Sequence, residues 1–249
     1  IAKLINWSYF FAGWGLAGRY PALLDDPIKG EEARKLFADA QELLQQIIDN
    51  KWLRANGVVG IYPATGDGDD IVLYAAERLW RKIARLRIFE DDDGKTNLSL
   101  ADFVAPAGSG IADYVGAFAV TAGIGLNELA ERFRRDNDDY RAIMTKLLGD
   151  RLAEAFAETL HRRVRTELWG YEKPDAFTPK ELFAGRYRGI RPAFGYPSCP
   201  DHSMKEDIFR LMRVTEATGI ALTESYMMTP GESTCGLIFG CEEARNFSI

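Results

Sequence analysis

Residues 189–202 carry the side chains best suited to binding a ligand. This segment contains three Pro, two Gly, one Arg and one Tyr within fourteen residues. Because Pro fixes the backbone and lacks an N–H donor, a rigid extended loop is predicted here, neither helix nor strand. A rigid loop that presents Arg191 and Tyr196 is a common way to build a ligand site. The residues alone fit equally well with a packed connector between two helices.

Two carboxylates on one face of a predicted helix are the second candidate. Asp150 and Glu154 lie four residues apart, on the continuation of an apolar stripe. Carboxylates at such positions either face a cleft or form ion pairs with basic side chains, here Arg151, Arg163 or another. The spacing leaves both alternatives open.

Motifs for several other chemistries are missing from the sequence. It contains no P-loop, no Gly-x-Gly-x-x-Gly after a strand, no Gly-x-Ser-x-Gly elbow, and no His-Glu-x-x-His or Cys-x-x-Cys. We therefore expect no protein-built metal site. His161 lies in the middle of a predicted helix, where a packing role is favoured over a catalytic triad. Cys235 and Cys241 are favoured as small core residues over a redox pair.

The composition is that of an ordinary globular protein. The 249 residues include 31 Lys and Arg against 37 Asp and Glu, a net charge of −6, which argues against nucleic acid as the main partner. Three Cys are too few for a disulfide framework and indicate a reducing compartment, so we expect a cytoplasmic protein. No apolar run reaches the roughly 18 residues of a membrane-spanning helix. A membrane is therefore not expected as a partner.

Apolar periodicity and turn residues predict the elements that position these side chains. Helices are predicted at residues 31–50 and 138–167 and after capping boxes at Thr178 and Ser203, the last ending at Gly219; strands are predicted at residues 57–63, 70–74, 114–120, 222–227 and 237–239. The aromatic residues 7–15 are too rich in Gly to predict a helix, and a charged surface loop is predicted at residues 90–94, which lie outside the residues that the structure describes. Because helices and strands do not alternate regularly, we expect an α+β fold, with one domain over residues 1–249.

Arg191, Gly195 and Tyr196 form an Arg-x-x-x-Gly-Tyr motif. This motif resembles that of the activation, or reactivation, domain of cobalamin-dependent methionine synthase. Other stretches resemble the same family in the same order over nearly the whole chain: residues 7–11, 16–21, 57–60, 69–71, 100–106, 113–120, 138–140, 149–158, 160–161, 169–171, 218–219 and 222–225. The resemblance implies a C-shaped α+β domain with a twisted antiparallel sheet flanked by helices, unlike the Rossmann methyltransferases.

The resemblance implies a repair function in methionine biosynthesis. Cob(I)alamin is occasionally oxidised to inactive cob(II)alamin during turnover. The domain binds S-adenosylmethionine (AdoMet) and, with an electron from flavodoxin or a flavoprotein reductase, supports reductive methylation to methylcobalamin. The chain is thus expected to be a methyltransferase module. Its cobalamin would be carried by a partner, the cobalamin-binding domain of methionine synthase.

The resemblance also implies roles for single residues. Arg191 would hold the AdoMet carboxylate with two parallel hydrogen bonds. Glu154, now favoured as facing the cleft, would lie near the positive sulfonium and ammonium groups, and Tyr196 at the cobalamin-facing surface; these two are the expected catalytic residues. The expected AdoMet contacts are Asn6, Glu154, Arg191, Pro192, Ala193, Gly195, Tyr196, Asn246 and Phe247.

Several positions depart from the family pattern. Asn6 stands where the family has Asp, which removes a charge near the cationic ligand. Asn246 and Phe247 stand where the family has two aromatic residues, and Gly185 stands where some members have Glu. The family's final helical segment is expected to be missing beyond Ile249.

The sequence lacks an Asp-x-His-x-x-Gly cobalamin-ligand motif and room for folate and homocysteine barrels. The chain is therefore not expected to make methionine alone, but to be one domain of a split enzyme or a fragment of a longer chain. The alternative function is a docking module for a cobalamin-methyltransferase partner that has lost methyl donation, which Asn6 and Asn246 motivate. An AdoMet-using enzyme with another substrate is a third reading.

Overall fold

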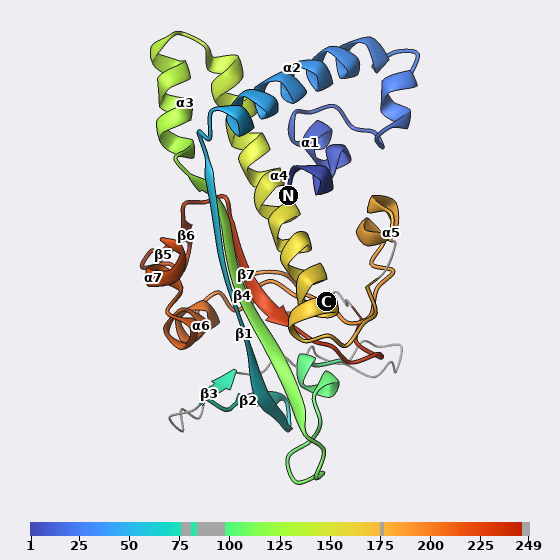
Figure 1. Ribbon diagram of the computed structural model, residues 1–249, viewed down its shortest axis with the longest axis vertical. Coiled ribbons are helices and arrows are strands. Elements are labelled where there is room, and N and C mark those ends of the chain that lie inside the picture. The colour runs from blue at the N-terminus through green and yellow to red at the C-terminus, as the bar shows by residue number, and fades with distance from the viewer. Residues whose placement is uncertain (76–80, 84–97, 175–176, 246–249) are drawn as a thin grey trace, which may run out of the picture. The chain divides into compact units, whose positions relative to one another are not determined.

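The fold is taken from a computed structural model that describes residues 1–75, 81–83, 98–174 and 177–245. Helices and strands follow one another without regular alternation, which confirms the predicted α+β class (Figure 1). In chain order the main elements are α1 (Trp7–Gly13), α2 (Gly30–Asp49), β1 (Arg54–Asp67), β2 (Asp70–Leu73), β3 (Arg81–Ile83), β4 (Asp113–Ile124), α3 (Leu126–Arg135), α4 (Asp139–Arg163), the π-helix η4 (Val164–Leu168), α5 (Pro179–Phe183), α6 (Met204–Met212), α7 (Val214–Thr218), β5 (Ala221–Leu222), β6 (Met228–Thr229) and β7 (Ser233–Ile238). Four short 3₁₀ or π segments are labelled η, the 3₁₀ ones being η1 (Ala2–Leu4), η2 (Ala22–Asp25) and η3 (Leu100–Phe103).

The strands form a five-stranded sheet in the order β3-β2-β1-β4-β7 and a two-stranded sheet of β5 and β6. The predicted hairpin is confirmed: β1 and β2 pair antiparallel, and Asp67 opposite Asp70 closes the register. Gly68 in the turn has φ +64°, a conformation that Gly adopts without strain. β4 is buried along nearly its whole length, as expected for a central strand.

The chain divides into two compact units, each built from separate stretches of sequence. The first comprises Ile1–Asn56, Val120–Thr159 and Met228–Ser233, and the second comprises Gly57–Ala119, Leu160–Met227 and Thr234–Ile249. β1, β4 and α4 continue from one unit into the other, so no single stretch of sequence marks a boundary.

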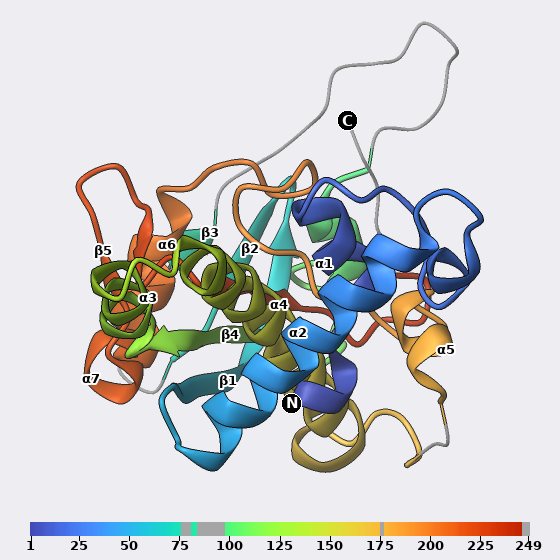
Figure 2. The same ribbon diagram turned by 90° about the horizontal axis from the view of Figure 1, so that it is seen from above.

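The core of the first unit is formed by α1, α2, α3 and α4. In both ribbon views α2 lies beside α4 (Figures 1 and 2). α2 buries its apolar face at intervals of three and four residues, as the sequence predicts. Residues 7–15, by contrast, include a helix that the sequence did not predict. Phe10 and Phe11 of α1 are both 0% exposed, and burial of two aromatic rings outweighs the weak helix propensity of the flanking Gly residues.

The core of the second unit lies around β4 and β7. Phe118, Leu237 and Phe239 are almost fully buried, and the ring of Phe103 meets that of Phe239 edge-on at 6.4 Å. A Cβ on Gly116 would approach Cβ of Ile238 to 3.0 Å, so β4 and β7 pack closely at that point.

Three predictions near the C-terminal end were wrong in detail. Ser203 precedes α6 but makes no capping bond; its N–H and hydroxyl instead donate to Asp201 at 2.8 and 2.6 Å. The helix predicted to run to Gly219 is interrupted at Arg213, which has φ +52°. The strand predicted at residues 222–227 is a turn between β5 and β6, in which Tyr226 has φ +61°.

Candidate functional site

Residues 189–196, called the edge segment below, run extended beside β7 in the second unit. The N–H and C=O of Ile190 both pair with Phe239 at 3.0 Å, and the Pro192 carbonyl accepts from the Leu237 N–H at 3.0 Å. The Phe194 N–H donates to the Cys235 carbonyl at 3.1 Å. These contacts form isolated bridges and no continuous strand, so the predicted rigid extended loop is confirmed.

The pairing pattern exposes main-chain groups on the outer side of the edge segment. The residues that bond to β7 are Ile190, Pro192 and Phe194. Because main-chain groups of an extended chain alternate in direction, the N–H groups of Arg191 and Ala193 point away from β7. The segment therefore has main-chain donors on the side away from β7, and such donors suit a carboxylate ligand.

A tight turn at the end of the edge segment presents Tyr196. The Gly195 N–H donates to the Cys199 carbonyl at 2.8 Å, and the Cys199 N–H donates back to Tyr196 at 2.8 Å. Gly195 has φ +95°, and a Cβ there would come within 2.3 Å of Cε1 of His202, so the position requires Gly. Tyr196 is 60% exposed, an unusually large fraction for an aromatic residue.

Arg191 is half-buried and lies near a buried histidine. Burial holds the pKa of His161 well below its usual 6.5, and the guanidinium groups of Arg191 and Arg165 lower it further. The imidazole next to Arg191 is therefore neutral at physiological pH.

In the first unit, Asn6 has a structural role. It is the N-cap of α1, and its Oδ1 atom accepts a hydrogen bond from the Ser8 N–H at 3.2 Å. Asp forms the same cap as well as Asn does. The Asn at this position therefore preserves the helix start and removes only the negative charge.

Glu154 lies half-buried on α4. Among the residues that the structure describes it forms no ion pair, and its two suggested partners are engaged elsewhere. Arg151 lies over the ring of Tyr9 at 5.8 Å, and Arg163 pairs with Glu167 at 3.0 Å. Neither of the two ion pairs suggested from the sequence is therefore formed.

Asp150, one turn before Glu154, has a raised pKa because of burial, which the charges of Arg151 and Lys146 partly oppose. Burial likewise raises the pKa of Glu232, and the charge of Asp150 raises it further. Asp150 and Glu232 are therefore close enough to affect each other. Glu154 was singled out from the sequence with Asp150, but the neighbour that the structure gives to Asp150 is Glu232.

The predicted ligand residues fall into three groups. Arg191, Pro192, Ala193, Gly195 and Tyr196 lie together on the edge segment of the second unit. Asn6 and Glu154 belong to the first unit. Asn246 and Phe247 lie outside the described residues.

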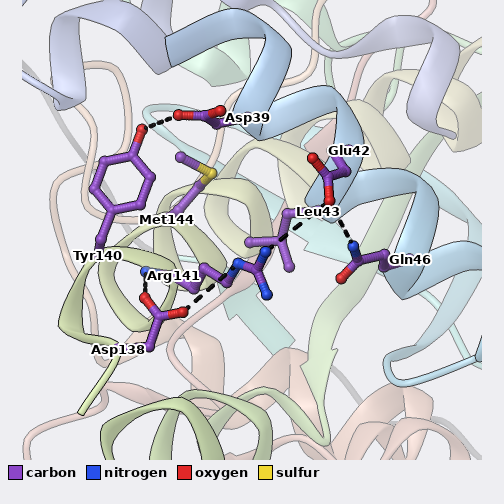
Figure 3. A pocket seen from close by; sticks show the side chains of 8 residues that line it. All are labelled: Asp39, Glu42, Leu43, Gln46, Asp138, Tyr140, Arg141 and Met144. Atoms are coloured by element: carbon purple, nitrogen blue, oxygen red, sulfur yellow. Dashed lines mark hydrogen bonds and ion pairs between the residues drawn. The ribbon is translucent and has the colours of Figure 1, made fainter. Parts of the chain in front are cut away.

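A polar hollow of about 330 Å³ lies between α2 and α4 in the first unit (Figure 3). Its polar groups bond to one another: the Tyr140 hydroxyl donates to Asp39 at 2.7 Å, and Arg141 lies 3.6 Å from Asp138 and 4.0 Å from Glu42. None of the predicted ligand residues lines it. These contacts link the two helices, and the hollow is assigned a structural role.

Over the described part of the chain, no group of three or more His, Cys, Asp or Glu side chains is arranged to hold a metal ion. Within the same residues, no helix is both long and apolar enough to cross a membrane. Cys199 and Cys235 are buried free thiols, and Cys241 is a partly buried one.

A buried polar network at the end of α4 was not predicted from the sequence. His161 was assigned to packing, but it bonds to Arg165 and Tyr171, and Arg165 pairs with Glu172. The signal was present in the spacing, since His161 and Arg165 are four residues apart and share a helix face. A polar pair on the buried face of a helix requires partners, and these follow within seven residues.

Comparison with known proteins covers the entire chain. Residues 1–249 match the family described as "Vitamin B12 dependent methionine synthase, activation domain". Among solved structures, the chain is similar to one described as "Crystal Structure of the MetH Reactivation Domain bound to AdoHcy", with a TM-score of 0.94 and 46% sequence identity. That match covers 99% of this chain and 77% of the other. Because the family match spans every residue, the chain belongs to the activation domains of vitamin B12-dependent methionine synthases.

Proposed function

We propose that the chain binds AdoMet and supports reductive methylation of cob(II)alamin to methylcobalamin, and thereby reactivates a cobalamin-dependent methionine synthase. The observation that carries the proposal is the bound ligand of the similar reactivation domain, which is AdoHcy. AdoHcy is what remains of AdoMet after its methyl group has been donated. At 46% identity over 99% of the chain, a shared ligand is the simplest inference.

Arg191 is the proposed carboxylate clamp. Its planar guanidinium can donate two parallel hydrogen bonds to the carboxylate of the methionine moiety. The N–H of Ala193, which points away from β7, adds a main-chain donor two residues further along the edge segment. Pro192 between them has no N–H and fixes φ, so the two donors are held at a constant spacing.

Glu154 is the proposed partner of the positive charges of AdoMet. The sulfonium and the α-ammonium both favour a nearby carboxylate. Glu154 has no competing ion pair among the described residues, so its charge is available to a ligand. Asn6 supplies no charge, and its contribution to binding would be limited to hydrogen bonding.

Transfer of the methyl group depends mainly on the relative position of donor and acceptor. The bond between the sulfonium and its methyl group breaks, the electron pair stays on sulfur, and AdoHcy is released, while cobalt of the substrate corrinoid gains the methyl group. Cob(II)alamin must first receive one electron from flavodoxin or a flavoprotein reductase. This chain aligns donor and acceptor and excludes water from them. Tyr196, on its exposed turn, is the proposed contact to the corrinoid.

The proposed partner is the cobalamin-binding domain of methionine synthase. The same cobalamin must also visit the other catalytic modules, so the complex should be transient. The domain acts as a methyltransferase module and does not make methionine alone. A reducing, cytoplasmic location follows from the sparse cysteines. The competing proposal is a docking module without methyl donation, which the missing charge at Asn6 favours.

The test is an anaerobic assay with reduced flavodoxin, AdoMet and a cognate cobalamin domain, read by the visible spectrum of methylcobalamin. The chain should accelerate methylcobalamin formation, and omission of AdoMet should abolish it. Isothermal titration with AdoMet separates the two proposals, because the docking module predicts no binding. A chain that binds the cobalamin domain but not AdoMet would favour the docking module.

A further inference from the structure

Four polar side chains at the end of α4 form what we call the His161 network: His161, Arg165, Tyr171 and Glu172. His161 and Arg165 are both 0% exposed. Nδ1 of His161 lies 3.1 Å from Nη1 of Arg165, and Nε2 lies 3.3 Å from the Tyr171 hydroxyl. Nε of Arg165 donates to Glu172 at 2.8 Å. The network is thus continuous from an imidazole to a carboxylate.

The hydrogen-bond partners of His161 determine which of its ring nitrogens carries the proton. A guanidinium has donors only, so Nδ1 must accept from Arg165. In a neutral imidazole Nε2 then carries the proton and donates to the Tyr171 hydroxyl. Burial raises the pKa of Tyr171, so its hydroxyl stays protonated and acts as the acceptor here.

Stability alone does not explain this arrangement. Replacing a buried ion pair by apolar residues of similar volume is often neutral or stabilising. The network also spans a π-helical turn, η4, which contains Arg165 and in which the Trp169 N–H bonds to the Val164 carbonyl at 2.9 Å. π-turns are rare and occur frequently at functional sites. Both observations indicate a role beyond packing.

The network holds the chain that leads into the edge segment. The second carboxylate oxygen of Glu172 accepts from the Arg188 N–H at 2.9 Å. The guanidinium of Arg165 lies 4.0 Å above the ring of Tyr187, and His161 meets the same ring edge-on at 5.1 Å. Residues 187 and 188 are therefore fixed immediately before the edge segment begins.

The network also contacts the point where the edge segment joins the β7 side. Gly189 has φ +82°, and a Cβ there would lie 2.1 Å from the Phe239 carbonyl and 3.2 Å from the Tyr171 hydroxyl. A Cβ on Gly240 would lie 2.9 Å from Cδ1 of Tyr171. Tyr171 is thus packed against both chains where Ile190 pairs with Phe239, one residue before Arg191.

We propose that the His161 network is a positioning device for Arg191, because it holds the main chain at the start of the edge segment, one residue before Arg191. A main chain held in this way fixes the point from which the Arg191 side chain reaches the carboxylate of AdoMet. This inference rests on the proposed function, because it assigns the network to the same AdoMet site.

The test combines one mutation with one change of ligand. Tyr171→Phe removes the hydroxyl that His161 contacts and keeps the ring against Gly240. We expect it to weaken AdoMet binding about five-fold, the loss expected for one hydrogen bond. Decarboxylated AdoMet lacks the group that Arg191 is proposed to bind. Its affinity should therefore differ less than two-fold between the unmodified chain and Tyr171→Phe. NMR titration up to millimolar concentration measures this weaker binding. Tyr114→Phe is the matched control, since the Tyr114 hydroxyl forms no hydrogen bond within the described residues, and it should alter neither affinity.

The outcomes separate this inference from the proposed function. If the unmodified chain does not bind AdoMet, the proposed function fails. If it binds AdoMet and Tyr171→Phe binds equally well, the network does not position Arg191. If Tyr171→Phe weakens both ligands by the same factor, the network has only a structural role and the inference is overturned. His161→Gln should reproduce the Tyr171→Phe pattern wherever circular dichroism shows that it folds.

Discussion

At the scale of single residues, Arg191 combines a fixed backbone with a half-buried side chain. Its main chain belongs to a segment whose neighbours Ile190 and Pro192 bond to β7. Its side chain lies beside the neutral imidazole of His161. A guanidinium held in this way has lost part of its side-chain freedom before the ligand arrives, which lowers the entropic cost of binding.

Arg191→Ala should therefore weaken AdoMet binding by about 2–4 kcal/mol, the cost of losing a charge-assisted bidentate pair. Arg191→Lys should recover only part of this, because a point charge does not reproduce the planar fork. Isothermal titration of the three proteins measures the difference. An unchanged affinity in Arg191→Ala would remove this residue from the site.

Asn6→Asp should tighten AdoMet binding by about 0.5–1.5 kcal/mol if the cationic ligand lies near this residue. The change keeps the cap of α1, because Asp and Asn both accept the Ser8 N–H. Asn6→Ser is the matched control, since Ser also caps the helix but adds no charge. Weaker binding in Asn6→Asp than in Asn6→Ser would show that the surroundings have adapted to the amide.

At the scale of elements, the turn that presents Tyr196 depends on Gly195. Gly195→Ala should destabilise the protein through both a positive φ and the approach to the His202 ring. Gly170→Ala is the matched control, because Gly170 has φ +74° with no atom within 4 Å of an added Cβ. We expect Gly170→Ala to cost about 1–2 kcal/mol and Gly195→Ala to cost more, as measured by urea unfolding. An equal loss of unfolding free energy in the two variants would mean that the approach to the His202 ring adds nothing to the cost of Gly195→Ala.

Elements with strong local signals were predictable from the sequence. Where two nearby groups compete for the same hydrogen bond, the sequence did not predict the outcome. The capping box of α5 is present, with Thr178 accepting from the Glu181 N–H and its own N–H bonded to Glu181. At Ser203 the same signal failed, because Asp201 two residues earlier binds the Ser203 hydroxyl first. Sequence spacing does not reveal which of two nearby acceptors is used.

At the scale of the whole molecule, chain topology limited what the sequence could predict about the site. The residues of the edge segment are adjacent in sequence, so their proximity followed from the motif. Asn6 and Glu154 belong to the other compact unit, which is assembled from three separate stretches. Their assignment to the site came from the family resemblance, because no spacing rule connects positions so far apart. The His161 network was missed because its partners lie beyond a π-turn.

The stability of the whole molecule should depend on pH through His161. In the folded protein this imidazole stays neutral, because burial and the charges of Arg165 and Arg191 lower its pKa well below 6.5. The hydroxyl of Tyr171 lies against the same imidazole, and burial raises its pKa, so it stays uncharged at neutral pH. In the unfolded chain the same histidine takes up a proton near its ordinary pKa of about 6.5. Below that pH the unfolded state binds more protons, so the free energy of unfolding must fall as the pH is lowered.

Between pH 7 and pH 5.5 the loss expected from this one group is about 1 kcal/mol. The raised pKa values of Asp150 and Glu232 act in the opposite direction, since the folded state binds their protons first, but mainly at the lower pH where carboxylates titrate. Urea unfolding at the two pH values measures the loss. His202→Gln removes the second of the two histidines and should leave the loss unchanged, whereas His161→Gln should abolish it. A loss that disappears in His202→Gln would assign the titration to the exposed histidine and contradict the buried, neutral state of His161.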